Sequence, residues 1–216
     1  MIEMNQKGEY ERPMKVLEKE YHLSYPFIFR WRGDYYMIPE TAQARSIELY
    51  RCTAFPLDWK LEKILMSDIK AVDTTLAEIN GLWWMFVNIG IDGTSNSGEL
   101  HLFYANTPLG PWNPHKRNPV KSDVRSARSA GRIFVWQGEI YRPSQDCSEG
   151  YGHAVSINKI IRIDPDRYIE AEVSKILPQW SRNVVATHTL NSCDNLIVID
   201  GMMKTFKFHH ARGVKA

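Results

Sequence analysis

Several features are scarce in this chain, and each scarcity excludes a class of protein. No apolar run approaches the roughly 20 residues that a membrane helix needs, and Met1–Lys7 lacks the apolar core of a signal peptide. The three cysteines, Cys52, Cys147 and Cys193, are odd in number and have no metal-ligand spacing, so we interpret them as reduced structural residues. The sequence therefore predicts a cytoplasmic protein with no membrane association.

Excess charge is also lacking. The 27 lysines and arginines nearly balance the 25 aspartates and glutamates, which leaves a formal net charge of +2. Such a balance gives no electrostatic basis for binding nucleic acid or an anionic membrane. Apolar residues make up 44% of the 216 residues, enough to bury the core of a single globular domain.

A predicted hairpin over Ala71–Asn88 is the most informative stretch. Asn80-Gly81 separates two apolar runs, and both residues of this pair tolerate the positive φ angles that a tight hairpin turn requires. The second run is rich in aromatic residues. Asp73 lies near the start of the first, as a carboxylate at the head of an otherwise apolar strand.

The same hairpin pattern recurs along the chain. It appears around Gly33 in residues 24–40, around Gly138 in residues 129–146, and in degraded form in residues 187–200, with Asp194-Asn195 as the turn. Further predicted strands follow the first three hairpins, at residues 46–51, 99–105 and 154–162. Short strands repeating at intervals of about 50 residues are typical of the blades of a β-propeller.

We therefore expect an all-β fold with one propeller domain over residues 1–216. The predicted units are the end of a first blade (1–20, with a strand at 9–17), full blades at 21–68, 69–122 and 123–180, and a last, partial blade at 181–216. Residues 204–210 are a candidate third strand of that last blade. Either the two terminal pieces complete one blade between them, or sequence is missing upstream; both alternatives stay open.

Six motifs together resemble one known family. They are HLSYPF (22–27), YMIPET (36–41), LFYA (102–105), PLGPW (108–112), DVRSAR (123–128) and YRPSQD (141–146). The resemblance, from about residue 9 to about residue 203, is to the propeller domain at the N-terminus of plant glucosamine inositolphosphorylceramide transferases. The same domain occurs in bacterial proteins beside sugar formyltransferase domains. It is similar in turn to the five-bladed propellers of glycoside hydrolase family 43, the arabinanases and β-xylosidases.

The resemblance implies a five-bladed propeller, here lacking part of the first blade, with a carbohydrate ligand in its axial funnel. It also implies a glycosyltransferase or formyltransferase partner. Asp73 matches the aspartate that tunes the acid in the hydrolases. The general-acid glutamate should fall at Ser129 or Ala130, and the base on the blade that precedes residue 9 in the family. Two of the three carboxylates are thus missing, which argues against ordinary family 43 hydrolysis, because a glycosidase needs a pair of them.

Other residues complete the predicted site. Glu40 and Asp146 join Asp73 as candidate catalytic carboxylates. The candidate substrate-binding residues are Tyr25, His101, Arg125, Arg128, Tyr141, Arg142, Gln145 and His188. The resemblance places His188 where arabinanase-like propellers carry a histidine near a central ion, so either Ca²⁺ or a water cluster fits there; no other metal or cofactor is predicted.

Structural roles compete with these assignments. Asp73 is equally well explained as a strand cap, Arg125 and Arg128 as ion-pair partners between blades, and His188 as a hydrogen-bonded core histidine. Three functions stay open: an enzyme acting on a glycan, a carbohydrate-recognition propeller that serves a transferase, and a protein-interaction scaffold. We interpret the chain as a carbohydrate-active, hydrolase-like propeller that acts on or recognises a glycan or modified sugar.

Overall fold

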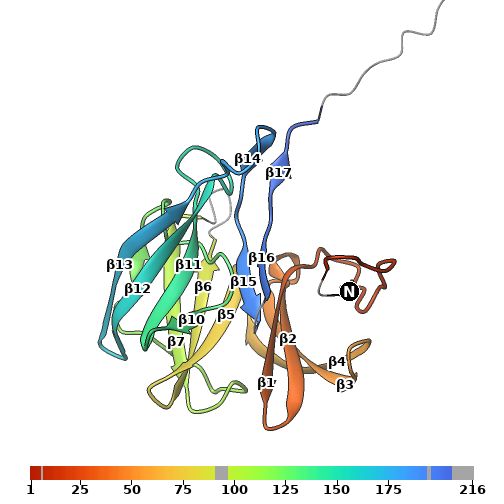
Figure 1. The fold of residues 1–216 in the computed structure, drawn as a ribbon. Helices are drawn as coiled ribbons and strands as arrows, with labels where there is room; N and C mark the ends of the chain where they lie inside the picture. Colours follow the sequence, from red (N-terminus) through yellow and green to blue (C-terminus); the bar gives the residue numbers. More distant parts are fainter. Residues whose placement is uncertain (6, 91–96, 194–195, 206–216) are drawn as a thin grey trace, which may run out of the picture.

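The structure is a computed structural model, and it describes residues 1–5, 7–90, 97–193 and 196–205. Within these residues the chain is all β, as predicted, and its only helical element is a 3₁₀ turn at Ala42–Ala44. Strands and turns alternate along the chain, and Figure 1 shows the resulting sheets standing side by side. No helix in the described part is long and apolar enough to cross a membrane.

Three large sheets are built from strands that follow one another in sequence. The first contains β1 (Ser24–Trp31), β2 (Asp34–Glu40), β3 (Ser46–Ala54) and β4 (Asp58–Ser67). The second contains β5 (Ala71–Ile79), β6 (Leu82–Ile89), β7 (Glu99–Ala105), β8 (Asn113–Pro114) and β9 (Lys121–Ser122), with β8 and β9 both paired to β7. The third contains β10 (Phe134–Trp136), β11 (Glu139–Asp146), β12 (Ala154–Asp164) and β13 (Arg167–Ile176). All of these pairings are antiparallel.

Two small sheets follow. In them β14 (Val184–Ala186) pairs with β17 (Met202–Met203), and β15 (Leu190–Cys193) pairs with β16 (Leu196–Ile199). In Figure 1 these strands, drawn in blue, lie between the first sheet in orange and the third in green and cyan. The five sheets do not join into one closed ladder among the described residues, and the predicted number and limits of the blades stay predictions.

The hairpin turns have the predicted geometry. Asn80 and Gly81 both have positive φ angles, of 54° and 77°, and the pairs Arg32-Gly33 and Gln137-Gly138 repeat this conformation. Two positive φ angles match the twist of antiparallel strands, which explains why a glycine recurs at the second position. The strands of the fourth hairpin, β15 and β16, also pair, and its turn residues Asp194 and Asn195 lie outside the described residues.

The N-terminal prediction was wrong in one respect. Residues 9–17 form no strand, and the described part of this segment contains only an isolated bridge between Met4 and Tyr10. Its composition explains the difference, because Pro13 removes a backbone donor and most of the side chains from 9 to 17 are exposed. Of the candidate strand at 204–210, residues 204 and 205 are not in a strand and the rest lies outside the described residues.

The core is divided between two interfaces, and β6 supplies side chains to both. Trp83, Met85 and Val87 pack in the cluster that includes residues of the first sheet, whereas Trp84 and Phe86 pack in the cluster that includes residues of the third. Successive side chains of a strand point to opposite faces, so a strand buried on both faces reads as an uninterrupted apolar run. The aromatic sequence of β6 therefore identifies it as a strand of the middle sheet.

Candidate functional site

The site is built around two β-bulges, which lie at matching places in the first and second sheets. The pairing of β1 with β2 shifts register between Ser24 and Phe27, and the pairing of β5 with β6 shifts in the same way between Val72 and Thr75. Inside these bulges Tyr25 and Asp73 have φ angles of 41° and 51°. A positive φ costs a non-glycine residue roughly 1–3 kcal/mol, and a bulge re-aims the side chain that it carries. The first two sheets thus use the same strained device to direct Tyr25 and Asp73.

Both side chains face a cavity of about 640 Å³. Its polar and aromatic lining includes Tyr25, Glu40, Asp73, Arg128, Tyr151 and His188. The start of β1, the end of β2 and the start of β5 form one wall. The segment before β10, the turn before β12 and the β15–β16 hairpin form the rest. The cavity therefore collects residues from all four parts of the chain that carry the repeated hairpin.

Asp73 is the centre of a buried polar network. Its Oδ2 accepts hydrogen bonds from Arg128 Nε at 2.6 Å and from Gln145 Nε2 at 3.0 Å. The side chains of Arg128 and Asp73 are only 12% and 5% exposed. Gln145 also donates to the carbonyl of Ser129 at 2.9 Å, which fixes its amide. An ion pair this deeply buried is held in one geometry because each lost contact would leave a charge without compensation.

Glu40 shares this network as a second carboxyl group. Burial, together with the negative charge of Asp73, raises the pKa of Glu40 to about 7, and Arg128 offsets only part of that rise. Asp73 acts on the Glu40 pKa in both directions, because its side chain raises that pKa and its backbone lowers it. Near neutral pH the two groups therefore act as a pair that holds a proton on Glu40 for part of the population.

Aromatic groups surround the carboxyl pair. The Tyr25 hydroxyl is hydrogen-bonded to Thr75 Oγ1 at 2.8 Å, and burial, followed by the charge of Asp73, raises its pKa. Arg128 lies over the ring of Tyr151 with its Cζ 5.0 Å from the centroid. His188 lies 5.2 Å from the Tyr151 ring, and its Nδ1 forms an ion pair with Asp200 when protonated. The cavity lining thus contains both charged and aromatic side chains.

The structure brings together Tyr25, Glu40, Asp73, Arg128, Gln145 and His188 of the predicted residues, five of them as cavity lining and Gln145 through Asp73. The alternative role of Arg128 as an ion-pair partner also holds, because it bridges the second sheet and the segment before the third. The ion pair of Arg128 with Asp73 therefore fits both the structural and the functional interpretation of Arg128.

The other predicted residues lie elsewhere. Asp146 ends β11, outside the cavity lining, and Lys175 and Ser148 donate to it at 2.7 Å and 2.6 Å. Burial opposes ionisation of Asp146, but these hydrogen bonds outweigh it and lower its pKa. Arg142 is fully buried and makes a two-pronged ion pair with Glu170 at 2.8 Å and 2.6 Å. These contacts stabilise the third sheet.

Three more predicted residues are not among the residues that line the cavity. Arg125 is exposed and pairs with Asp123 at 2.9 Å, and Tyr141 stacks on Phe134 with 5.5 Å between ring centroids. His101 lies on β7, where burial lowers its pKa and its Nδ1 finds no hydrogen-bond partner among the described residues. The sequence could not separate these residues from the cavity lining, because neighbours on a strand point to opposite faces.

The structure also describes the two positions at which the resemblance places the general acid. Ser129 and Ala130 are buried, and neither supplies an ionisable group. Among the described residues no three His, Cys, Asp or Glu side chains come together as a metal site requires, and the Ca²⁺ predicted near His188 stays a prediction. In the described residues around His188, the ring's partner is the single carboxylate of Asp200, which suits an ion pair better than a coordination shell.

Tyr151 and Arg132 also line the cavity, and neither is among the site residues that the sequence predicts. Arg132 packs over the Phe27 ring and donates to the carbonyl of Ile28, which links the segment before β10 to the first sheet. The glycines on both sides of Tyr151 marked it as a turn residue, but no local pattern could show that the turn folds over the cavity.

The chemistry of the site follows from its two neighbouring carboxyl groups. Glu40 and Asp73 both line the cavity, and the negative charge of Asp73 contributes to the raised pKa of Glu40. A carboxyl pair beside Arg128 can donate to and accept from the hydroxyl groups of a ligand.

Comparisons with known proteins agree with this architecture. A family model described as glucosamine inositolphosphorylceramide transferase 1, N-terminal, matches residues 4–193. Glucosamine inositolphosphorylceramide transferase 1 from Oryza sativa subsp. japonica is 42% identical over 162 residues, which cover 74% of this chain and 22% of the relative. The protein of the same name from Arabidopsis thaliana is 40% identical over 174 residues, which cover 77% of this chain and 22% of the relative. The chain spans about a fifth of the length of these relatives.

Solved structures show the fold. An endo-arabinase from Bacteroides thetaiotaomicron has a TM-score of 0.62 at 13% identity, covering 86% of this chain and 72% of its own. A thermostable family-43 glycoside hydrolase has a TM-score of 0.54 at 16% identity, covering 73% of this chain and 55% of its own. These likenesses confirm an all-β, propeller-type fold similar to the family-43 enzymes, and at such low identity they show the fold alone.

Proposed function

This chain belongs to the family of glucosamine inositolphosphorylceramide transferase 1 N-terminal domains, and on that premise we propose that it recognises a carbohydrate in the cavity around Asp73. The proposed ligand is a glycan or a modified sugar. The carboxyl pair of Glu40 and Asp73, set beside Arg128 and Tyr151, is the observation that carries the proposal. Sugars present many hydroxyl groups on an apolar ring, and a binding site for them needs both hydrogen-bonding and aromatic side chains.

Recognition fits the site better than hydrolysis. The positions expected to carry the general acid are Ser129 and Ala130, and neither side chain can donate a proton as a carboxylic acid. One observation favours hydrolysis as a second candidate, because a carboxyl group with a pKa of about 7 is suited to donate a proton near neutral pH.

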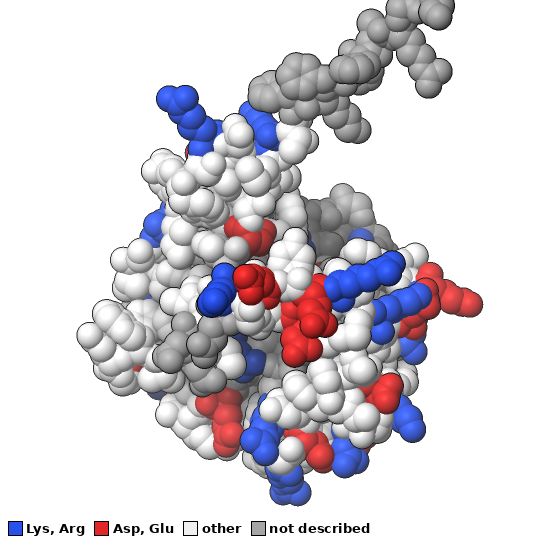
Figure 2. All heavy atoms as spheres, turned by 45° about the vertical axis from the view of Figure 1, so that its right-hand side comes forward, with Lys and Arg blue, Asp and Glu red and all other residues white. Residues whose placement is uncertain are grey.

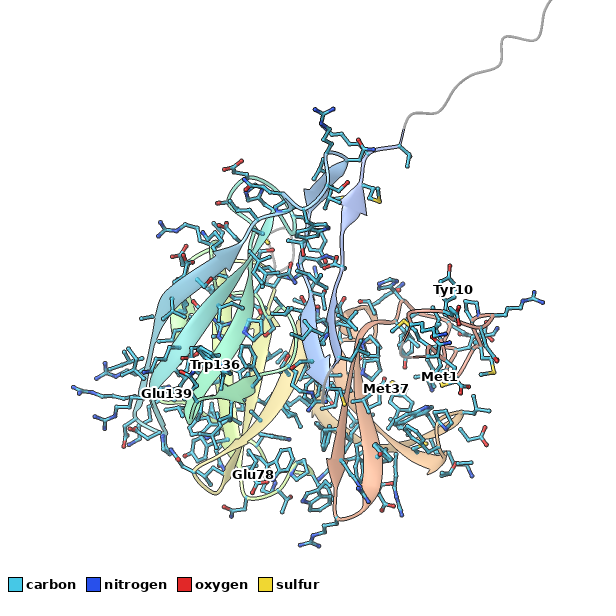
Figure 3. The ribbon with its side chains drawn as sticks, in the orientation of Figure 1. Met1, Tyr10, Met37, Glu78, Trp136 and Glu139 are labelled. Atoms are coloured by element: carbon cyan, nitrogen blue, oxygen red, sulfur yellow. The ribbon has the colours of Figure 1, made fainter. Side chains whose placement is uncertain are left out.

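The test measures binding and cleavage in the same samples. Methyl glycosides and oligomers of xylose, arabinose, N-acetylglucosamine and glucuronic acid are titrated by calorimetry, and products are followed by chromatography. Asp73→Asn keeps the shape of the side chain and removes its charge. Glu139→Gln is the matched control, because Glu139 is an exposed carboxylate paired with Lys159 at the other end of the third sheet (Figure 3). Binding without cleavage, weakened in Asp73→Asn and kept in the control, is the expected result.

Two other results would change the assignment. Cleavage that disappears in Asp73→Asn would make the protein a hydrolase with an unusual acid. No binding of any sugar would refute the proposed function and favour the protein-interaction scaffold. Asp146→Asn is measured in the same assay, since Asp146 stays a predicted catalytic residue.

We also propose that the chain works beside a glycosyltransferase or formyltransferase. The relatives are named transferases and are far longer than this chain, and the part that it matches is 22% of their length. A recognition domain would hold an acceptor sugar near a transferase site. The expected outcome is that adding the chain raises the reaction rate of a transferase encoded beside it at low acceptor concentration, and that chain carrying Asp73→Asn does so less.

A further inference from the structure

Tyr151 differs from the other aromatic side chains of the cavity. It is 56% exposed, whereas Phe27 is 5% exposed and the Tyr25 hydroxyl is held by Thr75. Its ring lines the cavity together with the Glu40–Asp73 pair. An aromatic ring exposed beside polar groups in a cavity offers an apolar face to a ligand that those groups can hydrogen-bond.

The ring is held in place by its neighbours. Arg128 lies over it, and the Arg128 side chain, whose Nε donates to Asp73, is only 12% exposed. His188 lies beside the ring at an interplanar angle of 55°. Because Arg128 is itself fixed by Asp73, the orientation of the aromatic ring is coupled to the carboxyl pair. A ring fixed before binding loses little conformational entropy when a ligand arrives.

The backbone around Tyr151 is fixed as well. Gly150 and Gly152 have φ angles of 137° and 63°, and the Gly152 carbonyl accepts a hydrogen bond from Thr187 N at 2.9 Å. A Cβ atom at Gly152 would lie 2.6 Å from His188 Cβ, so this turn packs directly against the segment before β15. The sequence Gly-Tyr-Gly therefore sets a single aromatic residue on a turn that only glycine allows to approach so closely.

We propose that Tyr151 is the stacking surface of the cavity, on which a sugar ring lays a face that carries only C–H groups. The inference rests on the proposed carbohydrate function and specifies it. The hydroxyl groups at the edge of such a ring would then reach Glu40, Asp73 and Arg128, which lie around the same cavity. Sugars with an uninterrupted C–H face, such as β-xylosides and β-galactosides, suit this surface.

The test uses methyl β-D-xylopyranoside, methyl β-D-galactopyranoside, methyl N-acetyl-β-D-glucosaminide and methyl β-D-glucuronide, titrated into wild-type protein by NMR. For the sugar that binds best, Tyr151→Ala is expected to weaken binding about ten-fold, and Tyr151→Phe to stay within about two-fold of wild type. The C–H protons on one face of the bound sugar should shift upfield in wild type and in Tyr151→Phe, because they lie over a ring, and this shift should be lost in Tyr151→Ala.

Trp136→Ala is the matched control. Trp136 is 59% exposed and lies beside the β10–β11 turn, at the opposite end of its hairpin from the cavity (Figure 3). Tyr151→Leu keeps apolar bulk without an aromatic face, so it separates stacking from packing if Tyr151→Ala is unstable. A sugar that binds wild type and Tyr151→Leu equally, without upfield shifts, would overturn the stacking role alone. No binding of any sugar to wild type would overturn the proposed function and this inference with it.

Discussion

Arg125 and Arg128 lie three residues apart and have opposite environments. Arg125 is 67% exposed as a side chain and pairs with its neighbour Asp123, whereas Arg128 is 12% exposed and reaches Asp73 in another sheet. Removing one partner of a buried ion pair leaves the other charge without compensation. We expect Arg128→Ala to lower the free energy of unfolding by roughly 3–5 kcal/mol, measured by urea denaturation.

Arg125→Ala is the control for this prediction. Exposed ion pairs contribute little, because water and salt screen them, so we expect no measurable change in the urea midpoint. Equal effects of the two substitutions would show that Arg128 is not held as a buried partner of Asp73.

The raised pKa of Glu40 makes stability depend on pH. Its carboxyl group has an ordinary pKa of 4.5 and a pKa of about 7 in the folded protein. The folded state therefore binds more protons than the unfolded state between these values, and the stability that Glu40 contributes is lost as pH rises through about 7. We expect Glu40→Gln to gain stability relative to wild type between about pH 5 and about pH 8.

Urea denaturation at several pH values measures this difference. Glu139→Gln, at an exposed carboxyl group, should show no such gain across the same range. A stability difference between Glu40→Gln and wild type that stays constant with pH would contradict a protonated Glu40 in the folded state.

The sequence identified some residues of the site and not others. Asp73 was found because a carboxylate at the head of an apolar strand is unusual, and its bulge explains why that position tolerates it. Asp146 and Arg142 have equally unusual surroundings, but their partners Lys175 and Glu170 come from β13, two strands away in the same sheet. Pairing across strands depends on register, which single residues do not reveal.

Among the elements, the segment before β10 holds the β15–β16 hairpin in place. Leu190 N donates to the carbonyl of Ala130 at 2.7 Å, and Arg132 N donates to Asn191 Oδ1 at 2.9 Å. Gly131 lies between these contacts with a φ of 131°, and a Cβ atom there would lie 1.9 Å from the Leu190 carbonyl oxygen. Only glycine permits this approach, and the hairpin forms one wall of the cavity.

Gly131→Ala is therefore expected to separate the hairpin from its support. The control is Gly138→Ala, which also imposes strain at a positive φ of 79° but meets no atom within 4 Å. We expect Gly131→Ala to be less stable than Gly138→Ala by roughly 1–3 kcal/mol, with faster amide hydrogen exchange at Leu190. Equal stability of the two variants would contradict the close approach.

The elements themselves were largely predictable. The repeated turn glycines identified the hairpins because both turn residues need positive φ angles, and the aromatic run of β6 indicated burial on both faces. Residues 9–17 were expected to be the last strand of a blade, but they form no strand and pair with no described strand. A segment forms a strand only where a partner edge exists.

For the molecule as a whole, the surface is mixed in charge and uneven in apolar exposure. Figure 2 shows basic and acidic side chains interspersed over one face, which agrees with the net charge of +2. In contrast, all four residues of β16 are exposed and apolar, and Ile197 is 71% exposed. Within the described residues β16 pairs only with β15, so its other edge carries no strand. An apolar edge strand promotes association between chains.

We expect Ile197→Lys to reduce concentration-dependent self-association, measured by sedimentation velocity, with little change in stability. Ile161→Lys is the control, because Ile161 is 59% exposed on β12, a strand paired on both sides. It removes similar apolar surface without protecting an edge. Equal effects of the two substitutions would attribute association to apolar surface in general.

The overall fold was predictable because the hairpin repeats along the sequence. An all-β fold of propeller type followed from the hairpin period, because each unit of such a fold must pack its faces on its neighbours. The repeat alone does not predict the cavity lining, because four segments distant in sequence meet there. Tyr25 and Asp73 occupy matching places in the repeat.

At these two bulges the functional side chain is independent of the regular strand pairing. Within each bulge two residues stand opposite one, so the side chain at the first of them takes no part in the regular pairing of its strand. A phenol occupies this place in the first sheet and a carboxylate in the second, while the hairpins around them keep the same shape. The protein can therefore exchange one functional group for another without redesigning a sheet, and a single substitution at such a place changes what the cavity can bind.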